Sequence, residues 1–180
     1  MKHFYNLILI LFLFVSVDSA RSQDTIVNNL HNFNIVDGNK FSFDIYAFRV
    51  TPSNFIMGSS SFIIKFNPTG TLDSVSLTNI NPKFTSGSPS GSYGPMICAM
   101  IGSQGNRRSV GVNVVYTGGT GDNISDVPGT FGIGERIATV NMKIQHPVFI
   151  TLQWDTEEST IISPNFQTAN SRYSGIYNGT

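Results

Sequence analysis

Apolar and polar residues alternate with a period of two along much of this chain. In residues 41–46 the apolar side chains are Phe41, Phe43 and Ile45, and the polar Ser42 and Asp44 lie between them. The same alternation recurs in residues 62–66, 110–116, 138–144 and 148–154. Strands with one apolar and one polar face are typical of antiparallel sheets. Beyond residue 22, no segment longer than ten residues has the period of a helix.

Turn-forming residues separate these alternating segments. Stretches rich in Gly, Pro, Asn and Ser occur at residues 37–39, 68–70, 86–94, 102–106, 117–123 and 128–129. Short strands at such spacing predict an all-β fold, an antiparallel two-sheet β-sandwich of the jelly-roll type with eight to nine strands. We assign residues 23–168 to this domain. The Gly-rich residues 117–123 lack the ending of a phosphate-binding loop, and we expect them to form a long hairpin.

The two ends of the chain differ from the predicted sandwich. Lys2 and His3 precede an apolar run from Leu7 to Val17, and small residues follow, which is the pattern of a signal peptide. We expect cleavage after Ser22, with Ser19 as the alternative. Residues 169–180 are polar and contain Gly, and we interpret them as a polar C-terminal tail or a truncated junction.

Charged residues make up 12% of the chain, against roughly 25% in an average soluble protein. The 11 basic and 11 acidic residues cancel, so neither a nucleic-acid binder nor a disordered chain is indicated. The only cysteine, Cys98, lies in the apolar run 95–101, which we interpret as a buried strand with Cys98 in the core. Any recognition should therefore use hydroxyls, amides, aromatic rings or strand edges.

Two stretches resemble the cohesin family and the carbohydrate-binding modules with the same jelly-roll sandwich. One is Ser61–Pro68 followed by Leu72, in which a strand ends at Asn67 and Pro68. The other is Gly132–Ile144, which is similar to the late strand that follows a Gly in these families. The resemblance covers roughly residues 24–164. It implies a module of secreted surface proteins, as in Bacteroidetes-type bacteria, that binds a protein or a polysaccharide.

Catalytic chemistry has little support in the sequence. His31 and His146 are the only histidines after the predicted leader, and neither belongs to a hydrolase or zinc-protease motif. Asp155, Glu157 and Glu158 form the densest run of carboxylates. Adjacent side chains of an extended segment point to opposite faces, so we expect a solvated loop rather than a glycosidase pair. We predict that the protein is not an enzyme.

Two groups of residues could bind a ligand. Asp122, Asn123 and Asp126 supply closely spaced oxygens that could bind calcium, although their spacing matches no defined calcium loop. No other cofactor is predicted. Exposed aromatic rings could stack on sugars, and the candidates are Trp154, Tyr93, Tyr116 and Tyr173. Trp154 alternates in register with Val148, Ile150 and Leu152, which favours a ring that faces the core.

Three functions remain open after these observations. The first is a secreted, non-catalytic, cohesin-like module that binds an extracellular protein or assembles at the cell surface. The second is a carbohydrate-binding module for polysaccharide. The third is a structural subunit that assembles by strand addition, for which the strand 110–116 is a candidate edge because it contains no Lys. No membrane span is expected after signal cleavage, because no second apolar run is long enough.

Overall fold

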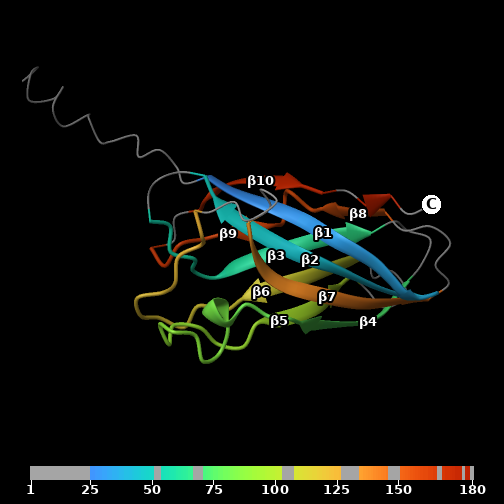
Figure 1. Cartoon of the computed structure of the whole chain (residues 1–180), viewed down its shortest axis with the longest axis horizontal. Coiled ribbons are helices and arrows are strands. Elements are labelled where there is room, and N and C mark those ends of the chain that lie inside the picture. Colours follow the sequence, from blue (N-terminus) through green and yellow to red (C-terminus); the bar gives the residue numbers. More distant parts are fainter. Residues whose placement is uncertain are drawn as a thin grey trace, which may run out of the picture.

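The computed structural model describes residues 25–50, 54–66, 71–102, 108–126, 134–145, 151–165, 168–175 and 177–178. The predicted signal peptide, Asn67, Pro68, Gly132 and His146 lie outside these residues. The described residues form strands in two layers and one short 3-10 helix (Figure 1). The elements are β1 (Thr25–Asp37), β2 (Lys40–Arg49), β3 (Ser60–Phe66), β4 (Thr71–Thr78), η1 (Pro82–Phe84), β5 (Ile97–Ile101), β6 (Ser109–Val114), β7 (Glu135–Gln145), β8 (Thr151–Trp154), β9 (Thr160–Ile161), β10 (Asn170–Ser174) and β11 (Tyr177–Asn178).

The strands form two sheets, which confirms the predicted β-sandwich. One sheet has the order β10-β1-β2-β7-β4, and we call it the first sheet. The other has the order β11-β8-β3-β6-β5, with β9 also paired to β3, and we call it the second sheet. The strand pairs are antiparallel except β1 and β10, which run parallel from Thr25↔Asn170 to Asn29↔Ser174.

The described residues contain more strands than the eight to nine predicted. The additional ones are short: β9 and β11 have two residues each. β10 lies within residues 169–180, where we expected a polar tail, and it pairs with β1. Its sequence, Asn-Ser-Arg-Tyr-Ser, has no apolar alternation, so its pairing depends on backbone hydrogen bonds that a hydropathy pattern does not register.

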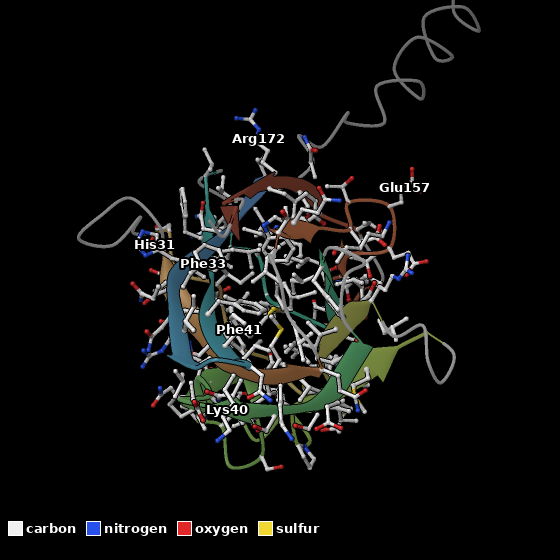
Figure 2. All side chains as sticks on the ribbon, turned by 90° about the vertical axis from the view of Figure 1, so that its right-hand side faces the viewer. His31, Phe33, Lys40, Phe41, Glu157 and Arg172 are labelled. Carbon is white, nitrogen blue, oxygen red and sulfur yellow. The ribbon has the colours of Figure 1, made fainter. Side chains whose placement is uncertain are left out.

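The core lies between the sheets and is rich in phenylalanine. Phe41 points into it while the neighbouring Lys40 points outward, as the alternation along β2 predicts (Figure 2). Phe43, Phe62 and Phe84 are fully buried. Burying one such side chain stabilises the fold by about 1.5–3 kcal/mol, so the aromatic residues account for much of the hydrophobic stabilisation.

Two predictions about β6 and the residues after it were wrong. The strand 110–116 is no edge, because β6 lies between β3 and β5 and is paired on both sides. The Gly-rich residues 117–123 form no hairpin, because β6 belongs to the second sheet and β7 to the first. Isolated bridges at the two ends of the segment instead join Tyr116 to Tyr93 and Asn123 to Ile56.

The run 95–101 also differs from the fully buried strand that we expected. β5 is the end strand of the second sheet, and only one of its faces is covered, so that Ile97 is 50% exposed. Cys98 faces inward and packs against the core, as predicted. Burial raises the pKa of its thiol to about 12. No helix in the described part of the chain is both long and apolar enough to cross a bilayer.

Candidate functional site

An apolar strip crosses the outer face of the second sheet. The registers of β3, β6 and β5 align Ile63 with Gly111 and Gly111 with Ala99 across the sheet. Ile101 and Ile97 belong to the flanking rows of the same face, because side chains two residues apart on a strand share a face. Ile63 is buried but is not part of the core cluster. We call these residues the β5 face: Ile63, Ile97, Ala99, Ile101 and Gly111.

Gly111 gives the β5 face a low centre. A Cβ atom on this residue would stand 3.0 Å from the Cδ1 atoms of both Ile63 and Ile101. Both isoleucine side chains therefore reach close to the space above the glycine. The exposed part of the strip lies on β5, where Ile97 and Ala99 are exposed and Ile101 is half-buried, and Ile63 and Gly111 continue it as buried residues.

Polar side chains border the β5 face. Ser61 Oγ donates a hydrogen bond of 2.6 Å to Asn113 Oδ1, and the registers place Ile97 beside Asn113. Lys65 and Ser109 lie beside Ile101 on the other side of the strip. Thus hydroxyl and amide groups flank the strip, as the residue composition suggested.

Lys65 is paired with a buried carboxylate at the border of this face. Its Nζ lies 2.7 Å from Oδ2 of Asp155, whose side chain is only 3% exposed. Asp155 Oδ1 also accepts hydrogen bonds from the backbone N–H groups of Glu157 and Glu158. Burial alone would raise the pKa of Asp155. The hydrogen bonds from Lys65 and from the two backbone N–H groups nevertheless hold this pKa below its usual value. The hydrogen bond to Asp155 raises the pKa of Lys65.

The position of Asp155 corrects the expectation of a wholly solvated acidic loop. Glu157 and Glu158 are exposed, and Glu157 points away from the sandwich (Figure 2). Asp155, however, begins a turn that closes against β3. Its backbone N–H donates to the carbonyl of Ile63, and Ser159 Oγ accepts from the Ile63 N–H at 2.9 Å. The turn thus supplies hydrogen-bond partners for the backbone of Ile63. This residue lies between the part of β3 that pairs with β8 and the part that pairs with β9.

The four candidate aromatic rings form two pairs rather than one exposed platform. Trp154 is buried, as its alternation predicted, and its ring centroid lies 5.1 Å from that of Tyr173. Tyr173 is half-buried and donates a hydrogen bond to the Ser159 carbonyl at 3.0 Å. Tyr93 is buried, and its ring centroid lies 5.8 Å from that of the half-buried Tyr116. None of these rings belongs to the β5 face.

The tyrosine pair helps to hold the loops at one end of the sandwich. Tyr93 Oη donates to the Met57 carbonyl at 2.6 Å and accepts from the Asp122 N–H at 2.9 Å. Burial raises the pKa of Tyr93 to about 12. Tyr116 Oη donates to the Gly119 carbonyl at 2.5 Å. These contacts bring together three segments that are distant in the sequence.

The candidate calcium ligands have other partners. Asp122 Oδ2 accepts a hydrogen bond of 2.5 Å from Ser90 Oγ, and Asp126 Oδ2 lies 3.3 Å from Arg49 Nη2. Asn123 forms a backbone bridge with Ile56. Within the described ranges, no three His, Cys, Asp or Glu side chains gather where they could hold a metal ion. Asp122 and Asp126 thus each have a side-chain partner within the protein.

The outer face of the first sheet is polar and contrasts with the β5 face. Asp44 is its buried carboxylate, which accepts hydrogen bonds from Thr139 Oγ1 and from Asn32 Nδ2, the latter at 2.7 Å. His31 is exposed there, points away from the sandwich, and makes an edge contact with the ring of Tyr46 (Figure 2). The two outer faces of the sandwich thus differ in chemistry, one apolar and one hydrogen-bonding.

The sequence reasoning missed the β5 face because its residues come from three strands. The alternation did place Ile63 on the face opposite Phe62 and Ile64, and an apolar residue in that position is the one available signal. The sequence contains no such signal for Ile97 and Ile101, because the run 95–101 is apolar on both faces. Only the pairing of β3, β6 and β5 brings these residues together.

Solved structures with a similar fold include several cohesin modules. The sixth cohesin of scaffoldin B from Acetivibrio cellulolyticus, solved in complex with a Cel5 dockerin, superposes with a TM-score of 0.55 at 12% identity, over 86% of this chain and 96% of that one. A cohesin module of a Clostridium perfringens family 33 glycoside hydrolase gives 0.51 at 11% identity, over 86% and 96%. A type II cohesin of the A. cellulolyticus adaptor scaffoldin ScaA gives 0.51 at 11%, over 89% and 99%.

The similarity to these structures lies in the fold. No family model matches the sequence, and no curated protein is similar to it. At 11–12% identity the superpositions establish a cohesin-like β-sandwich, in agreement with the resemblance found in the sequence.

Proposed function

We propose that this cohesin-like sandwich is a non-catalytic module that binds a protein partner through the β5 face. The observation that carries the proposal is the apolar strip across three strands, in which Ile97 and Ala99 are exposed, Ile101 is half-buried and Ile63 is buried at the inner end. Large contiguous apolar patches on a protein surface mark interaction sites more often than scattered apolar side chains do. An apolar centre with a border of hydroxyl and amide groups is also usual in protein interfaces.

The fold supports a protein as the partner. The A. cellulolyticus cohesin with the same architecture was solved in complex with a dockerin. A dockerin-like protein domain is therefore the first class of partner to test. Polysaccharide binding has less support, because Trp154 and Tyr93, two of its four candidate rings, are buried.

The charges near the strip predict how binding should depend on salt. Lys65 is neutralised by Asp155, and the strip itself contains no charged residue. Attraction between apolar surfaces is not screened by added salt, whereas attraction between exposed charges is. We therefore expect the affinity to change little with ionic strength.

Site-specific photo-crosslinking tests the proposal. A photoreactive amino acid replaces Ile97 in one variant and Ile35 in another. The two isoleucines have similar exposure, 50% and 54%, but Ile35 lies near the β1–β2 turn and outside the β5 face. Purified dockerin domains encoded in the same genome serve as probes, and an insoluble polysaccharide panel is run in parallel.

Adducts with a dockerin domain from position 97 but not from position 35 would support the proposal. Competition by the unmodified protein should abolish them. Equal labelling from both positions, or labelling from neither, would exclude the β5 face as the binding surface. Retention on a polysaccharide without any protein adduct would favour the carbohydrate-binding alternative.

We also propose that the module acts outside the cell. The support is the pattern of residues 1–22, in which a basic start precedes an apolar run and small residues. Mass spectrometry of the protein from the culture medium should give an N-terminus at Gln23, or at Ala20 if cleavage follows Ser19. A cell-associated protein that retains Met1 would contradict secretion.

A further inference from the structure

The turn between β1 and β2 presents an aspartate directly before a glycine. β1 ends at Asp37, β2 begins at Lys40, and Gly38 and Asn39 form the turn between them. The Asp37 side chain is 71% exposed, and its Oδ2 lies 3.6 Å from Nζ of Lys40, whose side chain is 55% exposed. Such an exposed ion pair restrains its two side chains only weakly. The Asp37 carboxyl group is therefore accessible and loosely held.

The backbone nitrogen of Gly38 is open to attack on its neighbour. Glycine has no Cβ atom, and apart from the two adjacent residues no heavy atom lies within 4 Å of the position that a Cβ would take. Among the backbone hydrogen bonds of the described turns and loops, none is donated by Gly38. No packing or hydrogen bond thus separates this nitrogen from the carboxyl carbon of Asp37.

The turn is also not of a type that hairpins favour. Two-residue hairpin turns are preferred as types I′ and II′, in which at least the first turn residue has a positive φ. Neither Gly38 nor Asn39 has a positive φ, and the register of β1 with β2 shifts between Ile35 and Asp37. The local preference that would fix one backbone conformation is therefore missing at this turn.

We propose that Asp37 is a site of spontaneous isoaspartate formation. The Gly38 nitrogen attacks Cγ of Asp37, and the bond from Cγ to the carboxyl OH breaks. This OH leaves with the amide proton as water, so that a five-membered succinimide remains. Water then adds to one of the two ring carbonyls. Cleavage of the Cγ–N bond restores aspartate, whereas cleavage at the main-chain carbonyl leaves the chain running through Cβ and Cγ.

The modification changes how the turn is joined to the first sheet. Isoaspartate adds one carbon atom to the main chain directly before Gly38. In the unmodified turn the Asn39 carbonyl accepts a hydrogen bond of 2.9 Å from the N–H of Ile144 on β7. A longer main chain displaces this carbonyl. We therefore expect the Ile144 amide to lose protection against hydrogen exchange once Asp37 is modified.

Peptide mapping by mass spectrometry tests the proposal on the purified protein, stored in mildly acidic buffer. The peptide that contains Asp37 should first lose the mass of one water. It should then regain this mass in a second chromatographic peak, which protein-isoaspartate methyltransferase labels. Asp126 is the internal control, because its side chain is 66% exposed but Val127 follows it. The branched valine side chain hinders attack by its own nitrogen, so this peptide should stay unchanged.

Gly38→Ala is the matched variant. The added Cβ atom meets nothing in the fold, so the protein should be as stable as the wild type. The same atom hinders attack by the residue's own nitrogen, so isoaspartate formation at Asp37 should slow several-fold. Hydrogen exchange followed by nuclear magnetic resonance should show faster exchange at Ile144 in the aged wild-type protein and no change in aged Gly38→Ala.

Two results would overturn the proposal. One is an Asp37 peptide that stays unmodified in the folded protein while a synthetic peptide of residues 33–42 is converted under the same conditions, because the fold would then protect the turn. The other is equal conversion in the wild-type protein and in Gly38→Ala, or equal conversion at Asp126, because the reaction would then not depend on the Gly38 nitrogen. Neither measurement uses a binding partner, so their failure is separate from a failure of the proposed binding function.

Discussion

Ile63 and Ile101 lie on strands that are not neighbours, yet their δ-methyl groups both approach Gly111 of the strand between them. Each would stand 3.0 Å from a Cβ atom at that position. Both contacts involve the ends of flexible side chains, so we predict that Gly111→Ala is tolerated. The free energy of unfolding should change by less than about 1 kcal/mol, measured by chemical denaturation. A loss of several kcal/mol would show that the two isoleucines cannot move apart.

Gly58 should respond differently, because its neighbours are backbone atoms. A Cβ atom there would lie 2.6 Å from the Ile162 carbonyl oxygen and 2.6 Å from the Ser163 carbonyl carbon. Gly58→Ala should therefore destabilise the protein by about 1–3 kcal/mol. Gly38→Ala is the matched control, since nothing lies within 4 Å of its Cβ position. Equal stability of the two variants would contradict the close approach at Gly58.

Asp155 should make stability depend on pH at the acid end. Its folded pKa is below the value of about 3.9 of an unfolded chain, so its contribution is present above that value and is lost as pH falls through the folded pKa. Asp155→Ala leaves two backbone N–H groups and Lys65 without their acceptor. We predict a loss of about 1–3 kcal/mol at pH 7.

Denaturation curves at several pH values check this prediction. The difference in free energy of unfolding between the wild-type protein and Asp155→Ala should shrink as pH falls below about 3.9, the unfolded pKa, towards the lower folded pKa. Glu157→Gln, which changes an exposed neighbour, is the control and should alter stability little. If the difference in free energy of unfolding between the two proteins stayed constant from pH 7 to pH 2, the charge of Asp155 would contribute nothing to stability.

Trp154 is the only tryptophan, and its burial gives a spectroscopic prediction. Its emission should be blue-shifted and protected from iodide in the folded state, and should shift to the red on unfolding. Trp154→Ala should cost about 3–5 kcal/mol, because the ring fills space between Phe62 and Tyr173. Trp154→Phe should keep most of the stability. Efficient quenching by iodide in the native protein would disprove the buried position.

Tyr93 should remain protonated well above the usual range for tyrosine. Its folded pKa of about 12 exceeds the unfolded value of about 10, so the contribution of its neutral hydroxyl is present below pH 10 and is lost as pH rises through about 12. Tyr93→Phe leaves the Met57 carbonyl and the Asp122 N–H without this partner, at a cost of about 1–3 kcal/mol. Ultraviolet titration of the wild-type protein against Tyr93→Phe measures the ionisation. If Tyr93→Phe showed one tyrosine fewer than the wild-type protein in the titration step near pH 10, the raised pKa of Tyr93 would be contradicted.

The sequence predicted the strands that have one apolar and one polar face. β2, β3, β6 and β7 were found because burial of one face leaves a period of two in the residues. The same signal placed Trp154 in the core. β10 was missed because a polar strand held by backbone hydrogen bonds to β1 has no such period.

The neighbour relations of the strands could not be predicted in the same way. Both 95–101 and 110–116 are apolar enough for an interior strand, and only long-range pairing decides that β6 is interior and β5 is at the edge. Asp155 belongs to an acidic run, and its burial depends on Lys65, which lies on a different strand. The β5 face follows from the same pairings, so it was visible only in the fold.

The parallel pairing of β1 and β10 determines how the domain bears tension. Thr25 lies opposite Asn170 and Asn29 opposite Ser174, so the N-terminal end of β1 and the C-terminal end of β10 lie at opposite ends of this ladder. A pull between those two directions acts along the strands and loads the hydrogen bonds of the ladder together, instead of opening them one after another from one end. The β1–β10 ladder would thus be loaded in shear by opposite pulls on those two strand ends.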